Sequence, residues 1–152
     1  MYDLILSLCP GLDLLGMAFE EEGFCVVRGG EPMFGQRGIE TFHPPSGVFQ
    51  GIVGGPPCQM WAQSHNLSGD KDKQFNLIPE FERVVLEAQP RWFLMENVTG
   101  APIPQVEGYL VMNRKLYAWE LGNPQRRYRR FSLGSKPPIM FLWPHGQRPP
   151  RG

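Results

Sequence analysis

The sequence predicts an α/β protein built on a doubly wound, mostly parallel β-sheet. Apolar segments of strand composition alternate with amphipathic helical segments over the first 96 residues, an order typical of parallel sheets. The run Trp92-Phe93-Leu94-Met95 is apolar throughout, as in a central strand that is covered on both faces. The 18 glycines and 16 prolines exceed what an all-helical domain carries, and the 152 residues suffice for one domain.

The first elements expected along the chain are a strand, a helix and a second strand. Residues 4–8 form an apolar run that stops at Cys9-Pro10-Gly11, where strands and helices both break. Asp13 can cap a helix that ends at Gly23. One face of that helix is expected to be apolar and to carry Leu14, Leu15, Ala18 and Phe19. Residues 24–27 have strand composition, and a Gly-Gly-Glu-Pro turn follows them.

The middle of the chain is predicted to hold two further strands and a long helix. A weak strand is expected at residues 39–42, and a clearer one at 48–53. The polar composition of residues 60–76 predicts a surface loop. A helix is expected over residues 77–88, because apolar residues recur there at helical spacing and prolines stand in its first turn and beyond its end.

The last third of the chain is predicted to be rich in strands. After the central strand, which ends at Glu96-Asn97, strands are expected at 109–112, 116–119, 131–133 and 139–143. The expected organisation is a single domain over residues 1–136 and a C-terminal tail over 137–152, which holds five prolines.

Composition excludes several classes of protein. No apolar run approaches the roughly 18 residues of a membrane span, so we expect a cytoplasmic protein without membrane contact. The three cysteines, Cys9, Cys25 and Cys58, form no CxxC pair, which argues against a disulfide framework and against a zinc ribbon, and no metal site is expected. The zero net charge conceals a division: residues 1–100 carry 6 basic and 13 acidic side chains, and residues 101–152 carry 9 basic and 2 acidic ones.

Candidate functional residues converge on one edge of the predicted sheet. Open α/β sheets bind ligands outside the carboxyl ends of their strands. Four features follow strand ends here, and they are the segment 9–13, Glu31, the loop Gly54-Gly55-Pro56-Pro57-Cys58-Gln59, and Glu96-Asn97. This convergence predicts a binding or catalytic site.

Cys58, Glu96 and the arginine run 126–130 each allow a functional and a structural interpretation. The rigid residues before Cys58 place its thiol at a loop tip, as in a nucleophile, whereas Cys9 and Cys25 lie in strand-like runs and are expected to be buried or inert. Glu96 ends a buried strand, where desolvation suits a proton donor, although it could also be a cap or a surface ion pair. The arginine run could be a solvated face, but strand alternation would put Arg127 and Arg129 on one side.

Taken in order, these motifs resemble those of the C5-cytosine DNA methyltransferases over nearly the whole chain. Residues 6–24 are similar to the family's first cofactor-binding motif and its helix, and Glu31 stands where its ribose-binding acid is expected. The loop 54–59 is similar to the catalytic loop at every position, Glu96-Asn97-Val98 to the second catalytic motif, and residues 124–129 to the glutamine-arginine-arginine motif. The segments 25–35 and 42–45 look like those of phage and prophage members.

The resemblance implies a Rossmann-like methyltransferase fold and assigns roles to particular residues. The implied reaction transfers a methyl group from S-adenosylmethionine to C5 of a flipped cytosine in DNA, through a covalent adduct of Cys58 with C6. Its implied catalytic residues are Cys58, Glu96, Arg127 and Arg129. The implied cofactor-binding residues are Leu8, Cys9, Pro10, Gly11, Leu12, Asp13, Glu31, Pro32, Gly55 and Pro57, and the implied substrate-binding residues are Pro56, Gln59, Asn97 and Gln125.

The sequence also departs from the family pattern, and these departures leave alternatives open. Ser7 stands where Asp is usual, and Asp13-Leu14 where a glycine pair is usual. No target-recognition domain is expected within the 152 residues. The chain could therefore be a minimal methyltransferase that acts alone, or a non-catalytic DNA- or partner-binding module. Such a module would be a pseudoenzyme, or one subunit of a split methyltransferase whose second polypeptide supplies target recognition. Methylation of RNA or of a free pyrimidine nucleotide is a weaker alternative.

Overall fold

One mixed β-sheet organises the protein. The computed structural model describes residues 3–9, 13–30, 38–57, 76–117, 120 and 127–142, and in that part the strand order is β2-β1-β3-β4-β6-β5. The four parallel strands are β1 (Leu4–Leu8), β2 (Cys25–Gly29), β3 (Gly51–Gly54) and β4 (Trp92–Asn97). β6 (Tyr128–Ser135) runs antiparallel to β4 and to β5 (Leu110–Tyr117). The predicted mostly parallel α/β sheet is confirmed.

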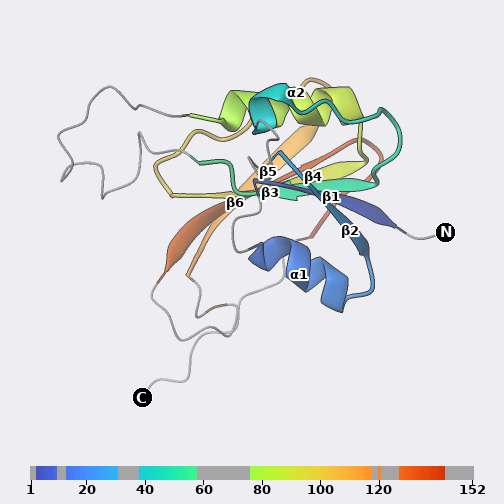
Figure 1. Ribbon diagram of the computed structural model, residues 1–152. Helices are drawn as coiled ribbons and strands as arrows, with labels where there is room; N and C mark the ends of the chain where they lie inside the picture. The colour runs from blue at the N-terminus through green and yellow to red at the C-terminus, as the bar shows by residue number, and fades with distance from the viewer. Residues whose placement is uncertain are drawn as a thin grey trace, which may run out of the picture.

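Helices cover the two faces of this sheet. α1 (Leu14–Glu21) lies on one face and α2 (Ile78–Ala88) on the other (Figure 1). Because side chains alternate along a strand, β1 sends Leu6 and Leu8 into the core under α2 and Ile5 into the core under α1. The sheet is therefore doubly wound, with a separate apolar core on each side.

The strand order reverses between β1 and β3, which brings several strand ends together. Leu8, the last residue of β1, pairs with Gly29 at the end of β2 and with Gly54 at the end of β3. β4 continues the parallel register, since Gly54 pairs with Met95. The loops that leave these four strands at the carboxyl edge consequently start side by side, at the place where doubly wound sheets bind ligands.

At the opposite, amino edge, backbone hydrogen bonds extend the sheet beyond its strands. The amide of Cys25 donates to the carbonyl of Asp3, and the amide of Gln50 donates to that of Leu4. The series continues across the sheet with two bonds of 2.9 and 3.0 Å, from the amide of Arg91 to the carbonyl of Gln50 and from the amide of Lys136 to that of Arg91. We call this series the amino-edge ladder.

The predicted strand at residues 39–42 is wrong. Residues Ile39–Thr41 form a 3₁₀ helix, η1. Arg83 on α2 donates to the carbonyl oxygens of Ile39 and Phe42 at 2.8 and 3.1 Å, so a side chain takes the acceptors that a neighbouring strand would otherwise use. The ring of Phe42 fills the space beside Gly29. Tertiary contacts therefore decide the local structure of this segment.

The number of strands predicted for the last third of the chain was wrong. The segments 109–112 and 116–119 belong, within the described residues, to the single strand β5, because pairing with β6 carries the strand through its polar middle. β6 is longer than residues 131–133, and residues 139–142 form no strand. They follow a turn closed by the bond from the amide of Ile139 to the carbonyl of Lys136, and the ring of Phe141 packs edge-on against Trp92.

Two predictions of burial were also wrong. Leu14 is 67% exposed, because α1 rests on the sheet through Leu15 and Phe19 and turns Leu14 away from it. Cys25 is exposed on the edge strand β2, whereas Cys9 is half-buried. Among the described residues, no helix is long and apolar enough to cross a membrane.

Candidate active site at the carboxyl edge

Glu96 lies where β4 and β6 meet, and two arginines of β6 approach it. β4 pairs with β6 up to Asn97 and Arg130, so β6 continues past the end of β4. Nε of Arg129 lies 3.2 Å from Oε1 of Glu96, and Nη2 of Arg127 lies 3.8 Å from the same oxygen. Both arginines thus reach one side of the strand, as their alternate spacing predicts, and surround one carboxylate.

The three side chains remain open to solvent to different degrees. The side chains of Glu96 and Arg129 are 24% and 29% exposed, and that of Arg127 is 50% exposed. Burial lowers the pKa of the Arg129 guanidinium, the like charge of Arg127 lowers it further, and Glu96 opposes both effects. The pair of Glu96 and Arg129 is therefore partly desolvated yet still accessible to a bound molecule, a setting in which ionic hydrogen bonds are strong.

Asn97 ties the end of β4 to the loop that follows β3. Its Nδ2 donates to the carbonyl oxygen of Pro56 at 2.9 Å, and its Oδ1 accepts from the amide of Val98 at 2.8 Å. A Cβ atom added at Gly55 would lie 3.0 Å from Oε2 of Glu96, so only glycine fits there without a shift. The segment that leads into Cys58 therefore starts against the carboxylate of Glu96, although Cys58 itself lies outside the described residues.

The cofactor-binding residues expected after β1 are described only at the two ends of their loop. Leu8 is buried, while Cys9 and Asp13 have positive φ angles of 49° and 47°. Their position at the reversal of strand order fits a nucleoside-containing cofactor, which doubly wound sheets bind at that point. Pro57 is exposed and Pro56 is buried. The predicted site residues that lie outside the described part are Pro10, Gly11, Leu12, Glu31, Pro32, Cys58, Gln59 and Gln125.

Arg28 was not among the residues that the sequence singled out. It lies near the end of β2 and reaches α1, where its guanidinium donates to both carboxylate oxygens of Glu20 at 2.8 and 3.0 Å and to Oδ2 of Asp13. The hydrogen bonds to Glu20 raise the pKa of Arg28. A basic residue at the end of a predicted strand, within an acidic half of the chain, was the signal that could have found it.

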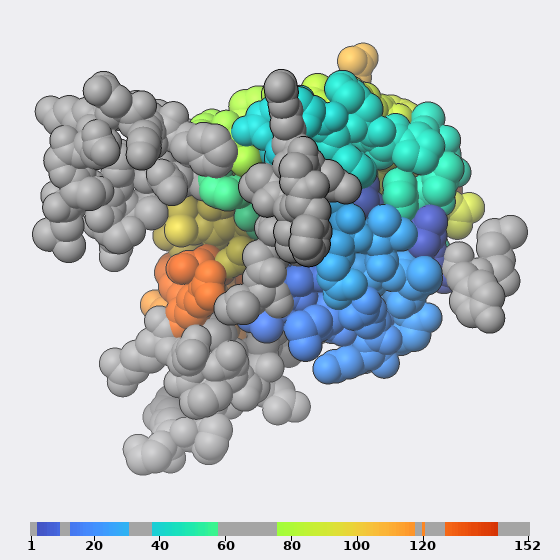
Figure 2. Space-filling view, in the orientation of Figure 1, coloured from blue at the N-terminus to red at the C-terminus, as the bar shows by residue number. Residues whose placement is uncertain are grey.

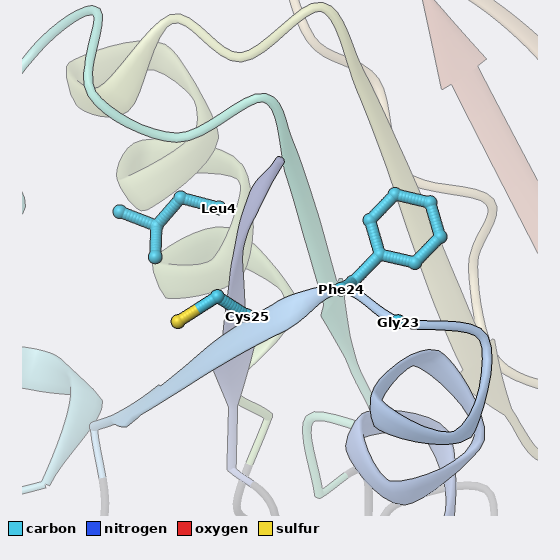
Figure 3. Close-up of a pocket in the computed structure, with 4 residues that line it drawn as sticks. All are labelled: Leu4, Gly23, Phe24 and Cys25. Carbon is cyan, nitrogen blue, oxygen red and sulfur yellow. The ribbon is translucent and has the colours of Figure 1, made fainter. Parts of the chain in front are cut away.

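Segments from distant parts of the sequence meet on one side of the molecule. Figure 2 shows the segment of β6 in orange beside the yellow segment that follows β4 and a green segment near the end of β3. A separate hollow lies at the amino edge, lined by Leu4, Gly23, Phe24 and Cys25 (Figure 3). It is at the far end of the strands from Glu96. Within the described ranges, no group of three or more His, Cys, Asp or Glu side chains could hold a metal ion.

Comparisons with known proteins agree with this arrangement. Residues 36–147 match the family of C-5 cytosine-specific DNA methylases. The type II methyltransferase M.FnuDI of Fusobacterium nucleatum is 31% identical over 86% of this chain and 46% of its own length. M.NgoPII of Neisseria gonorrhoeae is 28% identical over 93% of this chain and 51% of its own length. The chain therefore spans about half the length of these curated relatives.

A solved structure shares the fold. The Dnmt2 methyltransferase of S. pombe superposes with a TM-score of 0.62 over 92% of this chain and 52% of that one, at 16% identity. This likeness confirms the fold of an S-adenosylmethionine-dependent methyltransferase. Together with the match over residues 36–147, it leads to one conclusion: the chain belongs to the C-5 cytosine-specific DNA methylase family.

Proposed function

We propose that this chain supplies the catalytic and cofactor-binding part of a DNA cytosine-C5 methyltransferase that uses S-adenosylmethionine. The observation that carries the proposal is the cluster at the carboxyl edge. There, the carboxylate of Glu96 lies against Arg129, Arg127 and the start of the segment that leads to Cys58. A nucleophile, an acid and a fixed cation on one edge are the groups that addition to a pyrimidine ring requires.

The proposed chemistry begins with the thiolate of Cys58. Its sulfur forms a bond to C6 of the cytosine, and the electron pair of the C5–C6 double bond moves toward C5 while Glu96 hydrogen-bonds N3 and the amino edge of the base. When bound, S-adenosylmethionine would supply an electrophilic methyl group: its S–CH3 bond would break as the bond from the methyl group to C5 forms, and S-adenosylhomocysteine would leave. Loss of the C5 proton to a base then re-forms the double bond and expels the thiolate of Cys58.

Arg129 and Arg127 have proposed roles in orienting this reaction. Because Arg129 is the more buried and lies 3.2 Å from Glu96, it holds the carboxylate in place and is close enough to share the carbonyl oxygen of the base. Arg127 is farther away and half exposed, which suits ordering of the Cys58 loop. Asn97 contributes by fixing the backbone at Pro56.

The proposed cofactor site surrounds the ends of β1, β2 and β3. Leu8, Cys9, Asp13, Gly55 and Pro57 lie at that edge, and Glu31 and Pro32 follow β2 in sequence. The residues proposed to complete it are Pro10, Gly11 and Leu12, and those proposed to contact the base or its strand are Pro56, Gln59, Asn97 and Gln125.

The proposed substrate is DNA whose target cytosine is flipped out of the helix, because C5 and C6 are inaccessible to this edge in a stacked base. In the β5–β6 hairpin, β6 continues past the end of β4 beside Glu96. Lys115 of β5 is paired with Arg130 of β6 near this end. The proposed location is the cytoplasm of a bacterial or phage-infected cell, where the proposed DNA substrate would be found. A second polypeptide that supplies target recognition is a further proposed partner, and the exposed apolar side chains of Leu110 and Met112 on β5 would be available to it.

The test is trapping of the covalent adduct. Duplex DNA that contains 5-fluorocytosine is incubated with the protein and S-adenosylmethionine, and adducts are counted by denaturing electrophoresis and mass spectrometry. Fluorine at C5 cannot leave as a proton does, so the enzyme stays attached to C6. We expect an adduct with the unmodified chain and with Cys25→Ser, and none with Cys58→Ser.

Other outcomes distinguish the alternatives. DNA binding without an adduct, even when cofactor binds, would favour the non-catalytic module. An adduct that requires a second polypeptide would favour a split enzyme. Adducts with 5-fluorocytosine in RNA or in a free nucleotide, but not in duplex DNA, would overturn the proposed substrate.

A further inference from the structure

Three polar side chains meet beneath the start of the loop that follows β1. The hydroxyl of Ser7, on β1, donates to Oδ1 of Asp13 at 2.7 Å, and the amide of Gly16 donates to the same oxygen at 3.0 Å. Nε of Arg28 donates to the other carboxylate oxygen, Oδ2. Ser7 is 1% exposed and Asp13 is 8% exposed, so the carboxylate is buried and its bonds to Ser7 and Gly16 are shielded from water, whereas the Arg28 side chain is 41% exposed.

The backbone at Asp13 is held in a conformation that this residue would not adopt by default. Its φ and ψ angles are 47° and 44°, in the left-handed region that favours glycine. A Cβ atom at Gly16 would overlap the Asp13 carboxylate, so the helix must carry glycine where the side chain folds over it. Side-chain bonds, and not local preference, therefore fix the end of this loop.

Arg28 connects this point to a second strand end. It lies on β2 one residue before Gly29, which pairs with Leu8, and its guanidinium also binds Glu20 on α1 through two bonds. The loops that leave β1 and β2 are those proposed to hold the cofactor. A single arginine thus joins β2 to both the first cofactor loop and the helix behind it.

We infer that Ser7 and Arg28 are positioning residues for the cofactor, and that they act through the buried carboxylate of Asp13 without touching the cofactor themselves. The inference rests on the proposed function, because it assumes that the loop between Cys9 and Asp13 binds S-adenosylmethionine. Both oxygens of the carboxylate are engaged, so its contribution is to fix the backbone at Asp13, where the loop ends.

The first set of variants removes the carboxylate or one of its donors. The dissociation constant of S-adenosylhomocysteine is measured by calorimetry for Asp13→Asn, Ser7→Ala and Arg28→Gln, together with the melting temperature of each variant. Because each loses at least one hydrogen bond to a buried charge, we expect affinity to fall about tenfold or more. Glu21→Gln, on the exposed face of α1, changes the net charge as Asp13→Asn does and is expected to stay within about twofold of the unmodified chain.

An exchange variant separates positioning from general destabilisation. Ser7→Asp alone would place two carboxylates against each other and is expected to bind most weakly. Asp13→Gly alone relieves the backbone but removes the carboxylate, so affinity is again expected to fall. The double variant Ser7→Asp/Asp13→Gly puts the carboxylate at the other end of the same hydrogen bond, and we expect affinity to recover to within about threefold of the unmodified chain.

The outcomes are distinguishable. If the unmodified chain binds S-adenosylhomocysteine but the single variants bind equally well, or the double variant is no better than the weaker single one, the inference is overturned and the proposed function stands. If the variants lose affinity only in proportion to their melting temperatures, Asp13 is a structural cap and the inference also fails. If the unmodified chain itself binds no cofactor, the proposed function fails, and the inference fails with it.

Discussion

Tyr109 shows how one side chain makes the stability of this protein depend on pH. Its ring is buried against Phe93, and its hydroxyl donates to the carbonyl oxygen of Pro90 at 2.6 Å. Burial raises the pKa of Tyr109 from 10.0 to about 12. Since the folded state holds the phenol proton more tightly than the unfolded state, its contribution to stability is complete below pH 10 and is lost as the pH rises toward 12.

The variant Tyr109→Phe tests this dependence. It leaves the carbonyl of Pro90 without this donor, and we expect the free energy of unfolding at neutral pH to fall by about 1 kcal/mol. Between pH 10 and 12, the difference between the two proteins should shrink, because only the unmodified chain has this phenol to ionise. Urea unfolding followed by circular dichroism measures both quantities. Tyr128→Phe, on the surface, is the control, and a constant difference across the pH range would contradict the assignment.

Among the elements, β6 depends on a glycine that faces an aromatic ring. Gly134 pairs directly with Phe93 of β4, and a Cβ atom at Gly134 would overlap the Phe93 ring. That ring packs edge-on against Phe81 of α2 at a centroid distance of 5.9 Å. The close approach of strand, ring and helix therefore leaves no room for a side chain at this position.

Two alanine variants of β6 are expected to differ in their effect on the free energy of unfolding. Gly134→Ala forces the Phe93 ring to move, and we expect a loss of roughly 1–3 kcal/mol in the free energy of unfolding. Ser132→Ala, two residues away on the same strand, removes a fully buried hydroxyl that has no hydrogen-bond partner within the described part of the chain, and is expected to be neutral or stabilising. Chemical denaturation measures the free energy of unfolding of both variants, and an equal loss in the two would contradict this explanation.

The sequence predicted best those elements whose ends are marked by residues that cap or break helices and strands. β1, α1, α2 and β4 were predicted because apolar patterns begin or end at Pro10, Asp13, Gly23, Pro79 or Pro90. η1 was missed, because the contact that decides it comes from Arg83, about forty residues away. β5 was divided in two because edge strands tolerate polar residues, so its middle has no apolar pattern.

The candidate site could be predicted in part for the same reason. Glu96 was singled out because it ends a predicted strand, and Arg127 and Arg129 because alternation would put them on one side. Both arginines do approach the same oxygen of Glu96. The network of Ser7, Asp13 and Arg28 was not found. It depends on a left-handed residue and on the pairing of two strands, neither of which leaves a periodic signal in the sequence.

For the whole molecule, the division of charge predicts how DNA binding depends on salt. The β5–β6 hairpin belongs to the basic part of the chain, whereas residues 1–100 carry a net charge of −7. If the basic part contacts phosphates, affinity for duplex DNA should fall linearly with salt concentration on logarithmic axes. Lys115→Gln should reduce that slope by about 1.

The matched control is Arg91→Gln. Arg91 is exposed and precedes β4, so it lies at the edge of the sheet away from Glu96. Arg91→Gln removes one positive charge, as Lys115→Gln does, and is expected to leave the salt slope the same as in the unmodified chain. Fluorescence anisotropy with a labelled duplex over a salt series measures both variants. A similar change in slope for both would mean that DNA contacts are not confined to the hairpin side.

The amino-edge ladder has a consequence for how this fold can change. Four backbone hydrogen bonds from Asp3 to Lys136 set the register of the sheet at one edge, and they depend on no particular side chain. The loops at the other edge can then vary in length and composition without shifting the strands that hold them. The two edges of the sheet therefore differ in how well they tolerate mutation. New specificities can be acquired in the loops of the carboxyl edge, while the amino edge keeps the strands in register.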